Sequence, residues 1–132
     1  MGKVYMSSQI NQSPTITAPA GAELTGVHGL LLKFDTDGNV VAAGAGEKAI
    51  GIAIITNNEN VEKGEDVDIQ IKDIGLVKAG AAFKKGAELA ADASGKAIEA
   101  TAGQFVIGTA LRAATADGDL VSIQICPYYK PQ

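Results

Sequence analysis

The chain has 132 residues, a length typical of a single domain, and its formal net charge of −4 gives a sequence pI near 4.9. Nucleic-acid binding requires a basic stripe, which this acidic sequence lacks, and no apolar run is long enough to span a membrane. Aromatic residues make up 5% and Trp is absent, so the core must be built from Val, Ile, Leu and Ala, and 16 glycines against 4 prolines favour short strands and tight turns.

The first fifteen residues are polar and include Pro14, and neither a helical nor a strand periodicity runs through them. They also lack the apolar stretch of a secretory signal. We therefore interpret residues 1–15 as an extended N-terminal arm and residues 16–132 as a single β domain.

Short β-branched and apolar segments follow one another from Thr15. Asp37-Gly38 predicts a two-residue hairpin of type I′, which needs positive φ at both central residues. Gly51 interrupts an apolar run, and this indicates a bulge or a close backbone approach within a buried strand. The predicted strands of the first half are 15–17, 30–34, 39–42, 48–55 and 67–71.

The second half follows the same plan. A helix over 79–91 is disfavoured because Gly80 and Gly86 interrupt it. Pro127 is expected to end the last strand, since proline cannot donate to a ladder, and Cys126 just before it is expected to be half-buried and unreactive. The predicted strands are 74–78, 87–91, 97–99, 105–111 and 121–125.

An internal duplication explains why the two halves of the sequence follow the same plan. Residues 35–55 align without a gap on residues 92–112, with 8 of 21 positions identical, and residues 64–71 then match residues 118–125. Glycines recur at turn-like spacing, whereas no catalytic residue type recurs. We predict an all-β fold, a small β-barrel or β-sandwich of about ten short strands, made of two similar halves at about 28–71 and 74–125.

The sequence contains few candidates for chemistry. Residues 35–39 read Asp-Thr-Asp-Gly-Asn and resemble the start of a calcium loop, but Gly falls at the fourth position and residue 12 of the motif is Gly46, where an EF-hand needs Glu. The only histidine, His28, and the only cysteine, Cys126, have no catalytic partner that the sequence reveals. We therefore predict no catalytic residue, no metal site, no cofactor and no enzymatic activity.

Several segments of the second half together resemble the capsid decoration proteins of tailed phages, also called cement or head-fibre proteins. The resemblance covers most of residues 15–125, and its residues are Ile74–Gly80, Lys85–Leu89, Asp92–Ala97, Val106–Leu111 and Asp117–Ile123. It implies a non-enzymatic, commonly trimeric protein, made in the host cytoplasm, that binds the major capsid protein on the outer surface of the virion. The arm would then suit capsid contact, through Val4, Tyr5, Met6, Ile10 and Pro14.

Two other classes of protein remain as alternatives. A small carbohydrate- or cell-surface-binding β-domain usually presents exposed Trp or Tyr, and this chain has no Trp and only Tyr5, Tyr128 and Tyr129. An enzyme subunit or a carrier barrel is disfavoured because the acid–base and nucleophile constellations are missing.

Overall fold

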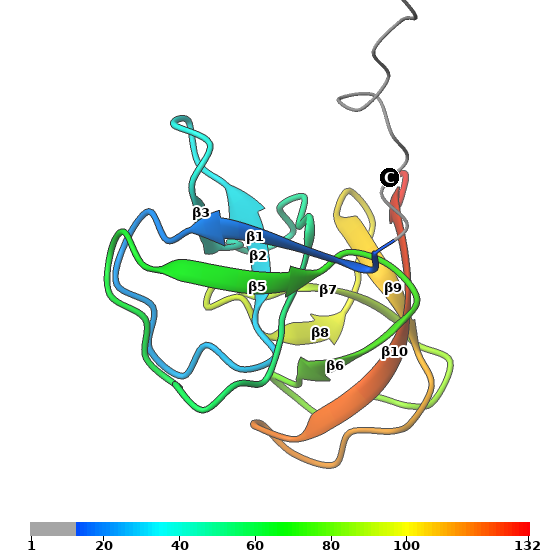
Figure 1. Ribbon diagram of the computed structural model, residues 1–132. Coiled ribbons are helices and arrows are strands. Elements are labelled where there is room, and N and C mark those ends of the chain that lie inside the picture. Colours follow the sequence, from blue (N-terminus) through cyan, green and yellow to red (C-terminus); the bar gives the residue numbers. More distant parts are fainter. Residues whose placement is uncertain (1–12) are drawn as a thin grey trace, which may run out of the picture.

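The computed structural model describes residues 13–132, and in that range the chain forms ten β-strands and no helix (Figure 1). The strands are β1 Thr15–Pro19, β2 Leu31–Phe34, β3 Val40–Ala42, β4 Gly51–Ala53, β5 Asp66–Gln70, β6 Ile74–Lys78, β7 Glu88–Ala91, β8 Ala97–Glu99, β9 Phe105–Ala110 and β10 Leu120–Tyr129. The all-β prediction is therefore confirmed.

The strands form two antiparallel five-stranded sheets with one shared topology. The first sheet has the order β1-β5-β4-β2-β3 and the second has the order β6-β10-β9-β7-β8. Each strand of the second sheet thus occupies the place of the strand five earlier in the chain. We call β1–β5 the first module and β6–β10 the second module.

Neither sheet closes into a barrel. Each strand order is open, and only a single parallel bridge brings the two ends of a sheet together. In the first module this bridge joins Ala20 to Val40, and in the second it joins Ala79 to Ala97. The modules are two strongly curled open sheets of the same design.

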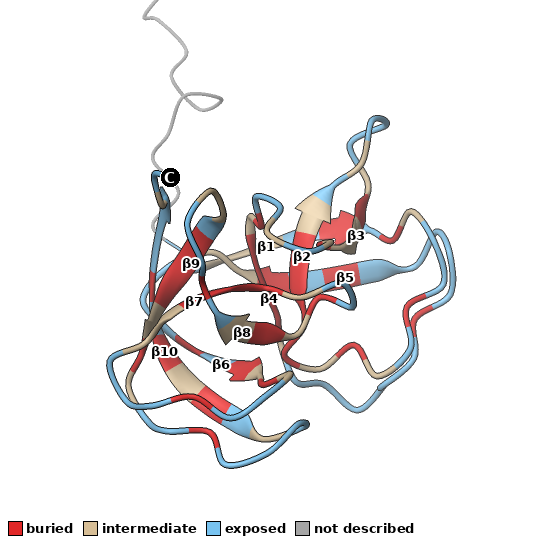
Figure 2. Ribbon diagram, turned by 180° about the vertical axis from the view of Figure 1, so that it is seen from behind, coloured by how far each residue is buried: buried red, intermediate tan, exposed pale blue. Residues whose placement is uncertain are grey.

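Two large hydrophobic clusters fill the modules, beside a small one of Ala90, Ala100 and Val106, and buried residues are red in Figure 2. The first cluster draws only on the first module, including the fully buried Leu32 and Ile69. The second is built on β6–β10 but also takes in four residues of the first module, Leu31, Ala43, Ala49 and Ile52. The first module therefore supplies part of the core of the second.

Backbone hydrogen bonds also cross between the modules. Leu31 donates to the Gly95 carbonyl at 2.8 Å, and Lys78 donates to the Gly29 carbonyl at 2.9 Å. Gly46 both donates to Ala91 and accepts from Phe105, at 2.9 and 3.1 Å. These bonds join backbone groups of one sheet to backbone groups of the other, and so they fix the two sheets relative to each other. They also give hydrogen-bond partners to backbone groups at the contact between the modules.

Equivalent glycines allow close backbone contact in both modules. A Cβ atom placed on Gly51 would collide with the backbone carbonyl oxygen of Gln70, and one on Gly108 would collide with that of Gln124. The close approach predicted at Gly51 is confirmed, and the duplication repeats it at the equivalent β9–β10 crossing.

The turn at Asp37-Gly38 is not of type I′, so this prediction is wrong. Gly38 has φ +82°, but Asp37 does not have positive φ. Instead Asp35 Oδ1 accepts hydrogen bonds from the backbone N–H groups of Asp37 and Asn39, at 2.9 and 3.0 Å. The aspartate side chain stabilises an ordinary turn and leaves only the glycine in the left-handed region.

The expected end of the last strand at Pro127 is also wrong. β10 continues to Tyr129, the red strand of Figure 1, because the pairing with β9 shifts register between Ile125 and Tyr128. Pro127 falls inside this irregularity, where the ladder does not need its missing N–H. Cys126 lies there too and is exposed, not half-buried.

Candidate interaction surfaces

The two residues considered for catalysis, His28 and Cys126, lie in different parts of the fold. His28 is partly exposed, and its Nε2 accepts a hydrogen bond from the backbone N–H of Thr56 at 3.2 Å, which ties it to the loop after β4. Cys126 lies on β10 at the register shift. Among residues 13–132, no three His, Cys, Asp or Glu side chains gather in a way that could hold a metal ion.

In the turn that resembles a calcium loop, the first aspartate bonds to backbone N–H groups of the turn itself. Asp35 Oδ1 already accepts from two N–H groups of the turn. The equivalent turn of the second module has the same design, since Asp92 Oδ1 accepts from Ser94 at 2.8 Å and from Lys96 at 3.0 Å. Both aspartates therefore hold hairpins together.

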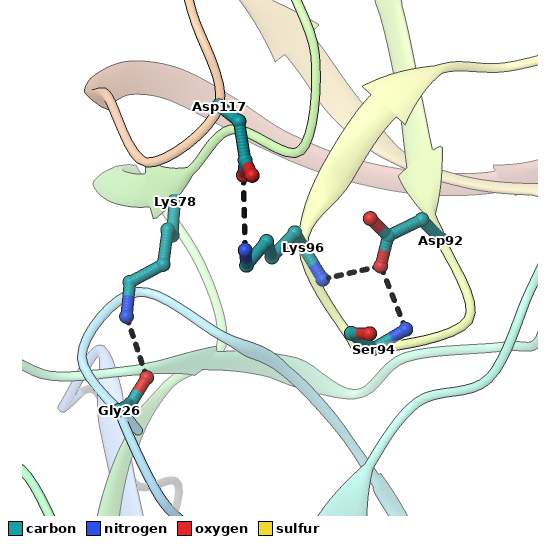
Figure 3. Close-up of polar contacts among 6 residues, drawn as sticks. All are labelled: Gly26, Lys78, Asp92, Ser94, Lys96 and Asp117. Carbon is teal, nitrogen blue, oxygen red and sulfur yellow. Dashed lines mark hydrogen bonds and ion pairs between the residues drawn. The ribbon is translucent and has the colours of Figure 1, made fainter.

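A cluster of charged groups lies at the groove where the modules meet (Figure 3). Lys78 Nζ donates to the carbonyl oxygen of Gly26 at 2.6 Å and so links β6 to the first module. Lys96 Nζ pairs with Asp117 at 2.9 Å, and this bond raises the pKa of the lysine. Each ammonium group makes a contact within the groove, and the bond of Lys78 to Gly26 joins the two modules there.

The predicted capsid-contact residues fall mostly outside the described part of the chain. Val4, Tyr5, Met6 and Ile10 precede residue 13. Pro14 is described and exposed, and its carbonyl oxygen accepts the N–H of Ile71 at 2.8 Å. The structure thus shows where the arm joins the domain, beside the link between the two modules.

An aromatic cluster ends the second module. The rings of Phe105 and Tyr129 lie 5.0 Å apart at an interplanar angle of 59°. The hydroxyl of Tyr128 donates to Glu88, whose other oxygen pairs with Lys130 at 2.9 Å. The hydrogen bond from Tyr128, and then that from Lys130, lowers the pKa of Glu88, while Glu88 raises the pKa of Tyr128 to about 12. This network fastens the end of β10 to β7.

Three exposed aliphatic side chains lie on the outer side of β6 and β10. Ile74 and Leu76 of β6 are 62% and 46% exposed, and Leu120 of β10 is 44% exposed. Next to them lies a groove of about 350 Å³ between β4 and β6, at whose rim Ile55 is 43% exposed. We call these four side chains the apolar face.

Sequence reasoning placed these residues in or beside strands but did not identify the face. Only the pairing register shows that Gly75 and Val77 point inward, so that the larger Ile74 and Leu76 point outward. The sequence held one sign of the face: in the alignment of the two halves, the apolar Leu120 stands where the first half has the charged Asp66.

No helix in the described part of the chain has the length and apolar character of a membrane span.

A similar fold occurs in a protein of known structure. The chain is similar to the crystal structure of the head fiber gp8.5 N base in bacteriophage phi29, with a TM-score of 0.64 and 22% sequence identity. The match covers 85% of this chain and 92% of that one, and at this identity it shows a common fold. No curated protein matches the chain. A family model described as phage cement protein matches residues 36–125. Because that match spans more than half of the sequence, the chain belongs to the phage cement protein family, a family of structural proteins of the phage capsid.

Proposed function

We propose that residues 16–132 form one domain that decorates and stabilises the outer surface of a phage capsid as a trimer, after synthesis in the host cytoplasm. Its partner is the major capsid protein. The match to the phage cement family over residues 36–125 is the observation that carries this proposal.

The physical properties of the domain support a clamping role. A protein that binds only the assembled shell stabilises that shell by mass action. Three linked copies would hold more firmly than one, because the later contacts become intramolecular once the first has formed. Such a clamp needs rigidity and no reactive groups. In residues 13–132 every buried side-chain nitrogen or oxygen has a hydrogen-bond partner.

The N-terminal arm is the part that we assign to capsid contact, through Val4, Tyr5, Met6, Ile10 and Pro14. The anchoring of Pro14 to Ile71 supports this assignment, because it gives the arm a fixed point of departure. Twelve residues before Ser13 could reach about 40 Å when extended, enough to cross onto a neighbouring capsid subunit.

Co-sedimentation with capsids that lack the protein tests the proposal. The full chain should pellet with capsids of the phage that encodes it, and should raise their temperature of disassembly. A variant lacking residues 1–12 keeps Pro14 and its bond to Ile71, so we expect it to fold normally and to bind capsids more weakly. Failure of the full chain to bind capsids contradicts the capsid role, and undiminished binding of the shortened chain contradicts only the role of the arm.

A further inference from the structure

We propose that Asp37 is a site of spontaneous covalent modification, at which the chain converts from aspartate to isoaspartate through a cyclic succinimide. The sequence holds two Asp-Gly pairs, Asp37-Gly38 and Asp117-Gly118. An aspartate followed by glycine closes such a ring more readily than one followed by a larger residue, because glycine has no side chain to obstruct the attack. The first pair reacts, and the second is protected by its contacts in the fold.

The reaction has two steps and needs only water. In the first step the backbone nitrogen of the glycine bonds to Cγ of the aspartate. One carboxyl oxygen leaves as water, carrying the proton of that nitrogen and a proton from the solvent. In the second step water opens the ring and returns a proton to the solvent. Opening at Cγ restores aspartate, whereas opening at the main-chain carbonyl leaves a backbone that runs through Cβ and Cγ, which is isoaspartate.

Two kinds of contact decide how readily an Asp-Gly pair reacts. The N–H group of the glycine must leave its hydrogen bond, because its nitrogen becomes the nucleophile. The aspartate carboxylate must be free to turn toward that nitrogen. Both pairs are exposed, so access to water does not distinguish them. Their hydrogen bonds and ion pairs do.

The side chain of Asp37 is unrestrained at the tip of the hairpin between β2 and β3. Within residues 13–132 its carboxylate makes neither a hydrogen bond nor an ion pair. The N–H of Gly38 donates to the carbonyl oxygen of Asp35 at 3.2 Å, which is a long contact inside the same turn. A Cβ atom placed on Gly38 would have no atom within 4 Å, so there is open space where the ring forms. Opening of the tip therefore disturbs no distant segment.

Asp117 and Gly118 are held by two other segments of the second module. Lys96 Nζ pairs with Asp117 Oδ1 at 2.9 Å and holds the carboxylate in place (Figure 3). The N–H of Gly118 donates at 2.8 Å to the carbonyl oxygen of Ala79, directly after β6. The nitrogen of Gly118 can attack only after this loop has separated from Ala79.

The duplication shows that the hairpin does not need aspartate at residue 37. Ser94 occupies this place in the second module. Its backbone N–H donates to Asp92 Oδ1 at 2.8 Å, just as that of Asp37 donates to Asp35 Oδ1 at 2.9 Å. Asp37→Ser therefore gives the first hairpin the residue of the second, and the variant should fold normally while lacking the carboxyl group that forms the ring.

Storage of the full chain at neutral pH, in water enriched in a heavy oxygen isotope, tests the proposal. Each opening of a succinimide adds one labelled oxygen, and peptide mapping by mass spectrometry locates it. We expect label and isoaspartate to accumulate about tenfold faster at residue 37 than at residue 117, because Asp117 and Gly118 must first lose an ion pair and a backbone hydrogen bond. Asp37→Ser should abolish the labelling of this hairpin. Labelling at residue 117 that equals or exceeds that at residue 37, or an unlabelled residue 37, overturns the inference.

Two controls separate the effect of the fold from that of the dipeptide. In the chain unfolded by guanidinium, residues 37 and 117 should react at similar rates, since no contact then protects Asp117. In the folded chain, Lys96→Met removes the ion pair but keeps an apolar stem, and it should speed labelling at residue 117 while leaving residue 37 unchanged. A ratio of rates that is the same in the folded and unfolded chains would show that local sequence alone decides, and would contradict the protection assigned to Lys96 and Ala79.

Discussion

Substitution of Gly108 by alanine tests whether the crossing of β9 and β10 depends on a missing side chain. Gly108 does not have positive φ, so alanine is not strained there by its backbone conformation. The strain comes from contact, because the new Cβ would collide with the carbonyl oxygen of Gln124 and lie 3.0 Å from its carbonyl carbon. These are backbone atoms of a paired strand, and they cannot move without disturbing the ladder.

Overpacking of this kind costs about 3 kcal/mol, while the loss of chain entropy in the unfolded state returns about 0.4–1 kcal/mol. We expect a net loss of about 2–3 kcal/mol, which corresponds to a fall of about 10 °C in Tm for a domain of this size. Urea denaturation followed by circular dichroism, at one fixed protein concentration, measures the change. The control is Gly44→Ala, whose new Cβ would meet the side chain of Glu47 and no backbone atom, so it should cost only the bonds that Glu47 makes to the Gly44 N–H and to Lys33, less than Gly108→Ala costs. Equal stability of Gly108→Ala and Gly44→Ala would refute the steric argument.

Three further substitutions probe the modules and their contacts. Asp92→Ala should lower the free energy of unfolding by about 1–2 kcal/mol, because it removes two hydrogen bonds of its turn. The loss should exceed that of Asp35→Ala, since the turn of Asp92 also accepts the N–H of Leu31 from the first module. Equal losses in urea titrations would contradict this. Ile52→Ala should cost about 2–5 kcal/mol and still give one cooperative transition, since Ile52 belongs to the first module but packs in the core of the second; two calorimetric transitions would show separate domains. Glu88→Gln should return the pKa of Tyr128 from about 12 toward 10.0, as measured by tyrosinate absorbance. Because folding raises that pKa, the bond stabilises the fold fully below pH 10.0 and its contribution disappears as the pH rises through 12, so the wild type should lose stability across this range more steeply than Glu88→Gln.

Local patterns were enough to predict the strands whose two sides differ. In β5 the alternation of Val67, Asp68 and Ile69 places apolar residues inside and Asp68 outside, as the structure shows. The close approach at Gly51 was predictable because a glycine inside an apolar strand contributes no side chain to the core, and so marks a place where another backbone comes near. Such features depend on residues that are neighbours in sequence.

Features set by pairing between distant segments could not be predicted in this way. The register shift that carries β10 past Pro127 depends on its pairing with β9, where Tyr128 lies opposite Val106, 22 residues earlier in the chain. The outward direction of Ile74 and Leu76 likewise depends on which side of β6 packs on the core, because both sides of that strand contain apolar residues. A strand with apolar residues on both sides has no period-2 signal to read.

The duplication separates what the fold requires from what the surface does. Gly21 and Gly80 occupy equivalent places, and a Cβ atom on either would collide with the carboxylate of the hairpin aspartate, Asp35 or Asp92. A side chain at either glycine would displace the aspartate that organises its turn, so both modules need the same pair of residues. No such steric reason distinguishes Thr17 from Leu76, since both side chains point outward from an edge strand of the same design. The two modules therefore share the glycine–aspartate pair that their turns need, while their outward positions differ: Leu76 lines a groove beside Ile52 and Ile54 of the first module, and Thr17 bonds to Asp68.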